Sequence, residues 1–100
     1  MLKFGLVILT NVQYTDTFET KKRPVLVLFE EHGNIVCAGI TSNPKMEGIS
    51  ILKVEGALLD SVIKLNCLFT IPEQAVEKVL FTLSNEKKKL IKEELFKKLI

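Results

Sequence analysis

Three adjacent cations, Lys21, Lys22 and Arg23, directly precede a proline and an apolar segment. The guanidinium of arginine is a planar fork of donors that matches phosphate oxygens, and lysine adds a point charge. The cluster therefore fits contact with a phosphate-bearing ligand such as a nucleic-acid backbone. It fits a solvated surface loop equally well, and a net charge of only +2 does not by itself favour nucleic acid.

Hydroxyl groups at Thr41 and Ser42 are the second feature with chemical potential, since they directly follow an apolar segment. Such a hydroxyl can hold a phosphate oxygen, or it can bond to the backbone of its own loop. His32 is the only histidine, and its Glu-Glu-His-Gly-Asn setting is typical of a hairpin turn. We therefore expect it to lie away from Arg23 and to take no part in catalysis.

The two cysteines, Cys37 and Cys67, both lie within apolar segments. Their spacing is not that of metal ligands, and one histidine cannot complete a four-ligand zinc site with them. The sequence therefore predicts two small buried side chains, with no metal site and no cofactor. Unpaired thiols suit a reducing compartment, and the apolar start of the chain is too short for a signal peptide or a membrane span. We therefore expect a cytoplasmic protein with no membrane segment.

Apolar patterning predicts the elements that must position these residues. The chain has 100 residues, 47% apolar and 26% charged, which fits a single folded domain over residues 1–100. Short apolar segments rich in β-branched residues indicate strands, with loops over 11–20 and 41–48 and a turn over 30–34. The predicted strands are residues 5–9, 24–29, 35–40, 49–54, 61–65 and 67–71.

The last third of the sequence is predicted to be helical. Pro72 suits the first position of a helix whose apolar stripe lies within residues 76–80. A final helix, capped by Ser84 or Asn85, is predicted to run to the C-terminus. Its predicted buried side comprises Ile91, Leu95 and Leu99. Many short strands followed by an amphipathic helix predict a mainly β fold, a small barrel with a C-terminal α-helix packed on it.

Several segments, in their order and spacing, resemble one known family across nearly the whole chain. The match is to the PemK/MazF-like toxins, in the short form that has lysine before Arg-Pro and Thr-Ser after the third strand. It is carried by Gly5-Leu6-Val7-Ile8-Leu9, Lys22-Arg23-Pro24-Val25-Leu26-Val27-Leu28, Ala38-Gly39-Ile40-Thr41-Ser42, Gly56-Ala57-Leu58-Leu59-Asp60-Ser61-Val62-Ile63-Lys64, Leu68-Phe69-Thr70-Ile71 and Leu83-Ser84.

This resemblance implies an SH3-like β-barrel that forms a homodimer. It implies a metal-independent endoribonuclease that cleaves single-stranded RNA, and inhibition by a small antitoxin protein whose tail occupies the RNA groove. Arg23 matches the family's catalytic arginine and Thr41 its catalytic threonine, with Ser42 as a neighbouring helper. The function implied is that of the toxin of a type II toxin–antitoxin system.

In metal-free cleavage the 2′-hydroxyl of the RNA attacks the adjacent phosphorus and leaves a 2′,3′-cyclic phosphate. Arg23 would stabilise the phosphorane, and Thr41 would position it through hydrogen bonds. Lys21 and Lys22 would contact the RNA backbone. In the preceding loop Phe18, like Tyr14, could stack on a base or plug the barrel. Glu19 or Asp16 could act as the base or remain solvated, because no motif selects either.

Three departures from the family pattern bear on activity and RNA preference. Leu6 replaces an acidic residue, Phe81-Thr82 replaces a glycine before Leu-Ser, and Lys64 stands where arginine is common. The weak basic balance, Leu6 and the dependence of function on the site rather than on the fold keep two alternatives open on the same fold. One is a non-catalytic RNA- or protein-binding barrel, and the other is a toxin that targets topoisomerase.

Overall fold

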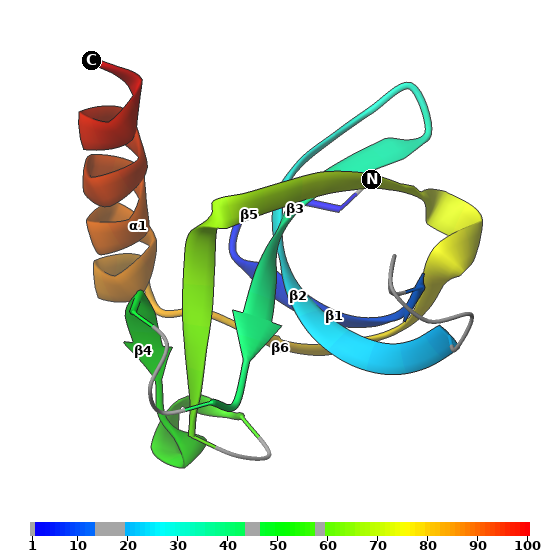
Figure 1. Ribbon diagram of the computed structural model, residues 1–100, viewed down its shortest axis with the longest axis horizontal. Helices are drawn as coiled ribbons and strands as arrows, with labels where there is room; N and C mark the ends of the chain where they lie inside the picture. Colours follow the sequence, from blue (N-terminus) through cyan, green and yellow to red (C-terminus); the bar gives the residue numbers. More distant parts are fainter. Residues whose placement is uncertain (1, 14–19, 44–46, 58–59) are drawn as a thin grey trace.

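The computed structural model describes residues 2–13, 20–43, 47–57 and 60–100. Its described residues form one six-stranded antiparallel sheet and one α-helix (Figure 1). The spatial order of the strands is β4-β5-β3-β2-β1-β6. Their bounds are β1 Leu6–Gln13, β2 Thr20–Glu31, β3 Asn34–Thr41, β4 Ile49–Ile51, β5 Ser61–Pro72 and β6 Val76–Thr82.

The hairpin between β2 and β3 is the centre of the sheet. Its two-residue turn is formed by His32 and Gly33, whose φ angles of 53° and 79° are both positive. A turn with two positive φ angles matches the right-handed twist of the strands that it joins. The turn predicted over 30–34 is confirmed at His32 and Gly33 alone, because Glu30 and Glu31 end β2 and Asn34 begins β3. His32 lies at the opposite end of the hairpin from Arg23 and Thr41.

Strand β3 is covered on both faces, so it separates two apolar clusters. Ala38 and Ile40 face the first cluster, which also contains Ile91 of the helix. Ile35 and Cys37 face the second, which also contains residues of β1, β2 and β5. Alternate residues of a strand point to opposite faces, so one segment contributes to both clusters. This explains why residues 35–40 read as a continuous apolar segment.

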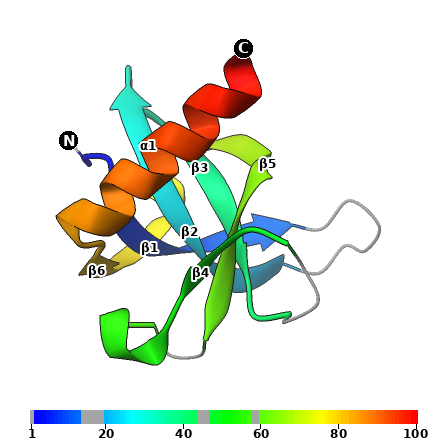
Figure 2. The same ribbon diagram turned by 90° about the vertical axis from the view of Figure 1, so that its left-hand side faces the viewer.

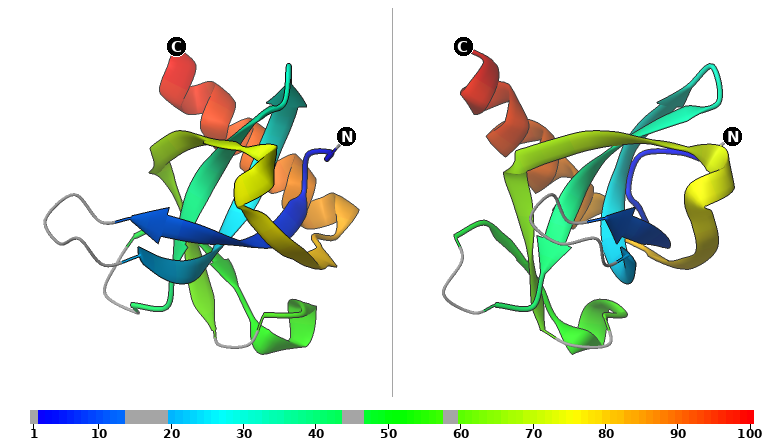
Figure 3. Two further views of the ribbon diagram at one scale, coloured as in Figure 1. Left: turned by 90° about the vertical axis from the view of Figure 1, so that its right-hand side faces the viewer. Right: turned by 45° about the vertical axis from the view of Figure 1, so that its right-hand side comes forward.

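The sheet curves strongly around the second cluster (Figures 1 and 3). Strands β1, β2 and β3 form the curved wall, and the end of β5 turns back over them. The described pairings leave β4 and β6 as the two edge strands. A curved six-stranded antiparallel sheet with one helix is therefore established, and closure into an SH3-like barrel remains a prediction.

Helix α1, Asn85–Leu99, lies across the sheet and covers the first cluster (Figure 2). Ser84 caps it as predicted, because its hydroxyl oxygen accepts a hydrogen bond from the Lys87 backbone N–H at 3.1 Å. Ile91 is fully buried and Leu95 packs beside it. Leu99 was predicted to be buried with them, which is wrong: it is 75% exposed near the end of the helix.

The predicted helix after Pro72 is wrong. A short 3-10 turn, Glu73–Ala75, follows Pro72, and residues 76–82 then form β6 beside β1. Two register shifts interrupt the pairing of β6 with β1, between Val7 and Ile8 and between Leu9 and Thr10. Such irregularities break the period-two alternation of a strand, so the apolar spacing of residues 76–80 resembled that of a helix.

Other strand boundaries also differ from the prediction. Residues 11–13 extend β1 into the loop that was predicted over 11–20. Residues 20–23 likewise belong to β2, which was predicted to begin at Pro24. Asn11, Lys21 and Lys22 are exposed in this part of the β1–β2 pair. Backbone hydrogen bonds hold the two strands together there without an apolar sequence pattern, so the pattern did not reveal the strands. The two short strands predicted around Asn66 are one strand, β5, with an irregularity opposite Ala38 and Gly39.

The strand predicted over 49–54 ends at Ile51 and is followed by a 3-10 turn, Lys53–Glu55. The carboxylate of Glu55 accepts a hydrogen bond from the Leu52 backbone N–H at 2.7 Å. This local bond turns the chain away from the sheet, because it satisfies a backbone donor that a longer strand would pair with its neighbour.

The cap of α1 can be tested by Ser84→Ala. We expect a loss of about 1 kcal/mol in the free energy of unfolding, since the Lys87 backbone N–H loses its partner. Urea unfolding followed by circular dichroism measures it. Ser50→Ala is the matched control, because Ser50 is exposed and its observed contact uses the backbone carbonyl. Equal stability of the two variants would contradict the role of the cap.

Candidate active site

The three cations of the sequence cluster lie on β2, within its ladder with β1. Arg23 is opposite Thr10, and Lys22 is opposite Asn11. The Thr10 side chain is fully buried, and its hydroxyl donates to the Ala75 carbonyl oxygen at 2.7 Å. The backbone of Arg23 is thus held by strand pairing and by a buried hydrogen bond next to it, within a strand that was predicted to begin only at Pro24.

Thr41 is the last residue of β3, and Ser42 follows it directly. The Thr41 hydroxyl oxygen accepts a hydrogen bond from the Asn43 backbone N–H at 3.2 Å. The sequence left two roles open for the Thr41 hydroxyl, a hydrogen bond to the backbone of its own loop or one to a phosphate oxygen. The first of these bonds is present. It does not exclude the other, since an accepted bond leaves the hydroxyl proton available to a ligand. The side chain is half-buried, whereas Ser42 is exposed.

A cavity of about 330 Å³, here called the Thr41 cavity, brings Thr41 and Arg23 together. Lys64 and Cys67 of β5 also line it, because β5 pairs with β3 and places Lys64 opposite Gly39. Two cations and no carboxylate are among its described lining residues. Two positive charges lining one cavity favour the approach of an anion.

A second cavity of about 360 Å³, here called the apolar cavity, shares Arg23, Pro24 and Ile40 with the Thr41 cavity. Lys21, Lys22, Arg23 and Ser42 line it together with Ser61. Its remaining lining residues are apolar or glycine: Val7, Leu9, Pro24, Ile40, Ile51, Gly56, Ala57, Leu80 and Phe81. Arg23 lines both cavities, so its side chain can serve a ligand that extends across both of them.

The structure thus brings together most of the residues that the sequence singled out. The remaining ones, Phe18 and Glu19 with Tyr14 and Asp16, lie outside the described residues. Lys22 also has an intramolecular partner, since its ammonium is 3.7 Å from a Glu77 carboxylate oxygen. Both side chains of this pair are substantially exposed, so it contributes little to stability.

Lys64 and Cys67 are the site residues that the sequence did not point to. Lys64 was noted only as a departure from the family pattern, and Cys67 was predicted to be buried, which is wrong because it is exposed. Pairing of β5 with β3 places both at the Thr41 cavity. Lys64 and Arg23 are 41 positions apart in the sequence. Their proximity could therefore be predicted only from the register in which β5 pairs with β3.

Cys37 behaves as the sequence predicts. Its thiol is fully buried and donates to the Phe69 carbonyl oxygen at 3.5 Å. Burial, and to a smaller extent electrostatic repulsion from the nearby Cys67, raise the pKa of this thiol to about 11. Among the described residues no cluster of histidine, cysteine or acidic side chains could hold a metal ion. Within the same residues no helix is long and apolar enough to cross a membrane.

Residues 3–99 match the PemK-like, MazF-like toxins of type II toxin–antitoxin systems. The chain belongs to this family. No curated protein matches the sequence significantly. Among solved structures, an endoribonuclease in complex with its cognate antitoxin from a mycobacterial species superimposes with a TM-score of 0.76 at 13% identity, covering 98% of this chain and 92% of the other.

The Mycobacterium tuberculosis toxin MazF-mt6 superimposes with a TM-score of 0.71 at 23% identity, covering 90% of this chain and 93% of the other. Both structures therefore share the fold of this toxin over nearly its full length. At such identities the agreement concerns the fold alone.

The different environments of the two thiols predict different reactivities. At pH 8 we expect a thiol reagent such as Ellman's reagent to label Cys67 rapidly. Cys37 should be labelled only after denaturation, because it is buried and its raised pKa keeps it protonated. The absorbance change counts the thiols in each phase. Cys67→Ser should remove the fast phase alone, and two fast thiols in the native protein would contradict this assignment.

Proposed function

We propose that this toxin is a metal-independent endoribonuclease that cleaves single-stranded RNA, including mRNA. The observation that carries the proposal is the position of Arg23, the only arginine of the chain, between two cavities. Thr41 lines one of them and Ser42 the other. An arginine that lines both cavities together with hydroxyl groups suits a phosphodiester that extends from one cavity to the other.

Family membership supports the same function, since the chain matches a family of type II toxins over residues 3–99. One structural relative of similar fold is described as an endoribonuclease bound to its cognate antitoxin. We extend the activity of that relative to this chain as part of the proposal. The antitoxin of this toxin is proposed, by the same argument, to be a small protein that covers the RNA site.

In the proposed reaction the 2′-oxygen attacks the adjacent phosphorus and forms a new P–O bond. The bond from phosphorus to the 5′-oxygen breaks, which leaves a 2′,3′-cyclic phosphate and a free 5′-hydroxyl. The proton of the 2′-hydroxyl goes to a base, and the leaving oxygen receives a proton. Arg23 stabilises the additional negative charge on the phosphorane, and the Thr41 hydroxyl donates to one of its oxygens.

The described residues that line the two cavities include neither a carboxylate nor the histidine, so we propose that the base comes from elsewhere. Glu19 and Asp16 belong to the segment that precedes β2, and they remain the candidates. Lys21 and Lys22 are proposed to contact RNA phosphates, and Phe18 to stack on a base. Two thiols without a disulfide suit a cytoplasmic location, which we include in the proposal.

Arg23→Ala tests the proposal directly. We expect kcat for single-stranded RNA in excess chelator to fall about 10²–10³-fold, the usual effect of removing one preorganised donor from a phosphorane or oxyanion. Thr41→Val should lower kcat about tenfold or more, through loss of a hydrogen bond to a charged group. Gel analysis of a labelled oligonucleotide measures both rates, and a phosphatase assay identifies the cyclic end.

Lys53→Ala is the control for loss of a positive charge, because Lys53 is exposed and lines neither cavity. It should leave the rate unchanged, and all variants should keep the circular dichroism spectrum of the wild type. Intact RNA at high enzyme concentration would overturn the proposal. Binding of a 2′-deoxy analogue without cleavage of RNA would indicate a non-catalytic binding protein, and DNA breaks on induction would indicate a topoisomerase-targeting toxin.

We further propose that the toxin is a homodimer. Exposed apolar side chains at the end of α1 support this, since three of them occur within five residues and single, scattered ones are the rule on monomers. These side chains are Phe96, Leu99 and Ile100. Light scattering of the purified protein should give twice the chain mass of 11.3 kDa. A mass equal to that of one chain at micromolar concentration would contradict the dimer.

A further inference from the structure

The proposed reaction requires a proton donor for the leaving 5′-oxygen, and the Thr41 cavity contains several polar groups that carry protons. Among its described lining residues these groups belong to Arg23, Thr41, Lys64 and Cys67. An arginine does not lose its proton in proteins, and an alcohol is a very weak acid. The ammonium of Lys64 and the thiol of Cys67 are therefore the described groups of this lining that could release a proton.

Lys64 has an environment that suits contact with an anionic substrate. It is half-buried, whereas most of the described lysines are exposed. The described ion pairs of lysines involve Lys22, Lys87 and Lys97. Lys64 thus has no carboxylate partner within the described part of the chain. Since partly buried charges are usually paired, an ammonium in this setting favours an anion from outside the chain.

Strand order places Lys64 and Arg23 on opposite flanks of the Thr41 cavity. Strand β3 lies between β2 and β5, so Arg23 reaches the cavity from one side and Lys64 from the other (Figure 1). In an in-line displacement the attacking and leaving oxygens lie on opposite sides of the phosphorus, so the base and the proton donor must also come from opposite sides. The candidates for the base precede β2 in the sequence, whereas Lys64 belongs to β5.

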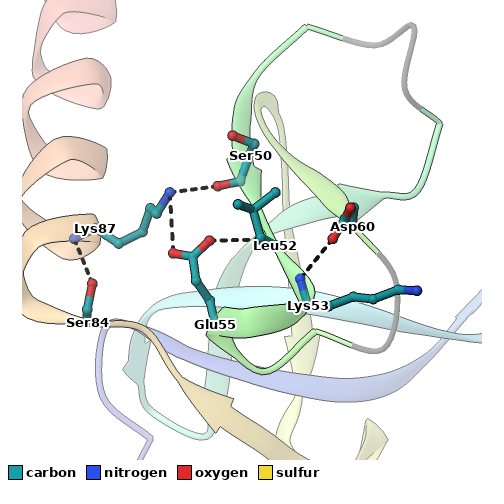
Figure 4. Close-up of polar contacts among 7 residues, drawn as sticks. All are labelled: Ser50, Leu52, Lys53, Glu55, Asp60, Ser84 and Lys87. Carbon is teal, nitrogen blue, oxygen red and sulfur yellow. Dashed lines mark hydrogen bonds and ion pairs between the residues drawn. The ribbon is translucent and has the colours of Figure 1, made fainter.

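The start of β5 is anchored to the turn formed by residues 53–55 (Figure 4). The Asp60 carboxylate, directly before β5, accepts a hydrogen bond from the Lys53 backbone N–H at 2.8 Å. Helix α1 holds the same turn, because the Lys87 ammonium lies 3.4 Å from a Glu55 carboxylate oxygen. The backbone that carries Lys64 is thus held at one end by these contacts and along its length by pairing with β3. A long side chain on such a support can approach one substrate oxygen at a low cost of ordering.

We propose that Lys64 is the general acid of the reaction and protonates the leaving 5′-oxygen. This inference rests on the proposed function and assigns the proton donor of that reaction. As the bond from phosphorus to the 5′-oxygen breaks, this oxygen takes a proton from the ammonium nitrogen and leaves as a hydroxyl group. Lys64 becomes a neutral amine and regains a proton from water before the next cycle.

Two observations favour Lys64 over Cys67 as the donor. Cys67 is exposed, so water surrounds its thiol more than it surrounds the half-buried Lys64. The sulfur of Cys67 also lies close to the backbone of β3, since a Cβ atom at Gly39 would be 3.3 Å from it. The longer side chain of Lys64 can instead follow the oxygen as it departs.

The test compares two leaving groups in single-turnover cleavage with excess chelator. One substrate is a labelled single-stranded RNA, and the other carries sulfur in place of the bridging 5′-oxygen at the bond that the wild type cuts. A thiolate is a much weaker base than an alkoxide, so it leaves without being protonated. Lys64→Met should lower the rate on the oxygen substrate about 10²–10⁴-fold, the usual contribution of a general acid. It should leave the rate on the sulfur substrate nearly unchanged.

Three further variants make the comparison specific. Lys64→Arg keeps the positive charge without a transferable proton, so it should also be slow on the oxygen substrate alone. It carries the test if Lys64→Met does not fold. Arg23→Ala should slow both substrates, since the phosphorane forms with either leaving group. Lys78→Met is the matched control, because Lys78 is an exposed strand residue that lines neither cavity, and it should leave both rates unchanged.

The outcomes separate this inference from the proposed function. A wild type that cuts neither substrate would overturn both. If the wild type cuts RNA and Lys64→Met slows both substrates equally, or neither of them, the ribonuclease stands and the general acid is disproved. Full activity of Lys64→Arg on the oxygen substrate would disprove it as well, since positive charge would then suffice. Slowing of the oxygen substrate alone by Cys67→Ser would assign the proton to that thiol and overturn the role of Lys64.

Discussion

Burial of β3 on both faces is the constraint on which the rest of the structure depends. A strand in this position must place apolar side chains alternately into two clusters, and it must pair on both edges. Strand β2 satisfies one edge and β5 the other. Where this two-sided burial ends, at Thr41, the chain can present polar groups to solvent. Arg23 on β2 and Lys64 on β5 line the same cavity as Thr41 for this reason.

The two cavities owe their different character to the same arrangement. The Thr41 cavity is lined by the three central strands β2, β3 and β5, and it carries two cations. The apolar cavity is lined by residues of β1, β2 and β6, the end of β4 and the segment that follows it. It therefore includes side chains that also pack in the first cluster, such as Val7 and Ile51. Arg23 lies where the two meet. A flexible side chain on a rigid strand can therefore serve both without any movement of the backbone.

Helix α1 contributes to the site from a distance. It covers the first cluster with Ile91, and through Lys87 it holds the turn formed by residues 53–55. The side chain of Lys87 is 18% exposed and that of Glu55 is 26% exposed, so this ion pair is better shielded from solvent than the other described pairs. Shielding strengthens an ion pair whose partners are also hydrogen-bonded. The helix that completes the core therefore also shapes the wall of the apolar cavity.

The sequence by itself determined what depends on local pattern: the strands around residues 24–29 and 35–40, the turn at His32-Gly33, and the final helix with its Ser84 cap. It also pointed to Arg23, Thr41 and Ser42, through an ordered resemblance to a family rather than through composition. Only the tertiary structure made residues 76–82 a strand, because the free edge of β1 pairs with them. The irregular register of this pairing hid the alternation that is typical of a strand. The positions of Lys64 and Cys67 at the Thr41 cavity likewise follow from the register of β5 against β3, since pairing between distant segments leaves no trace in the spacing of either one.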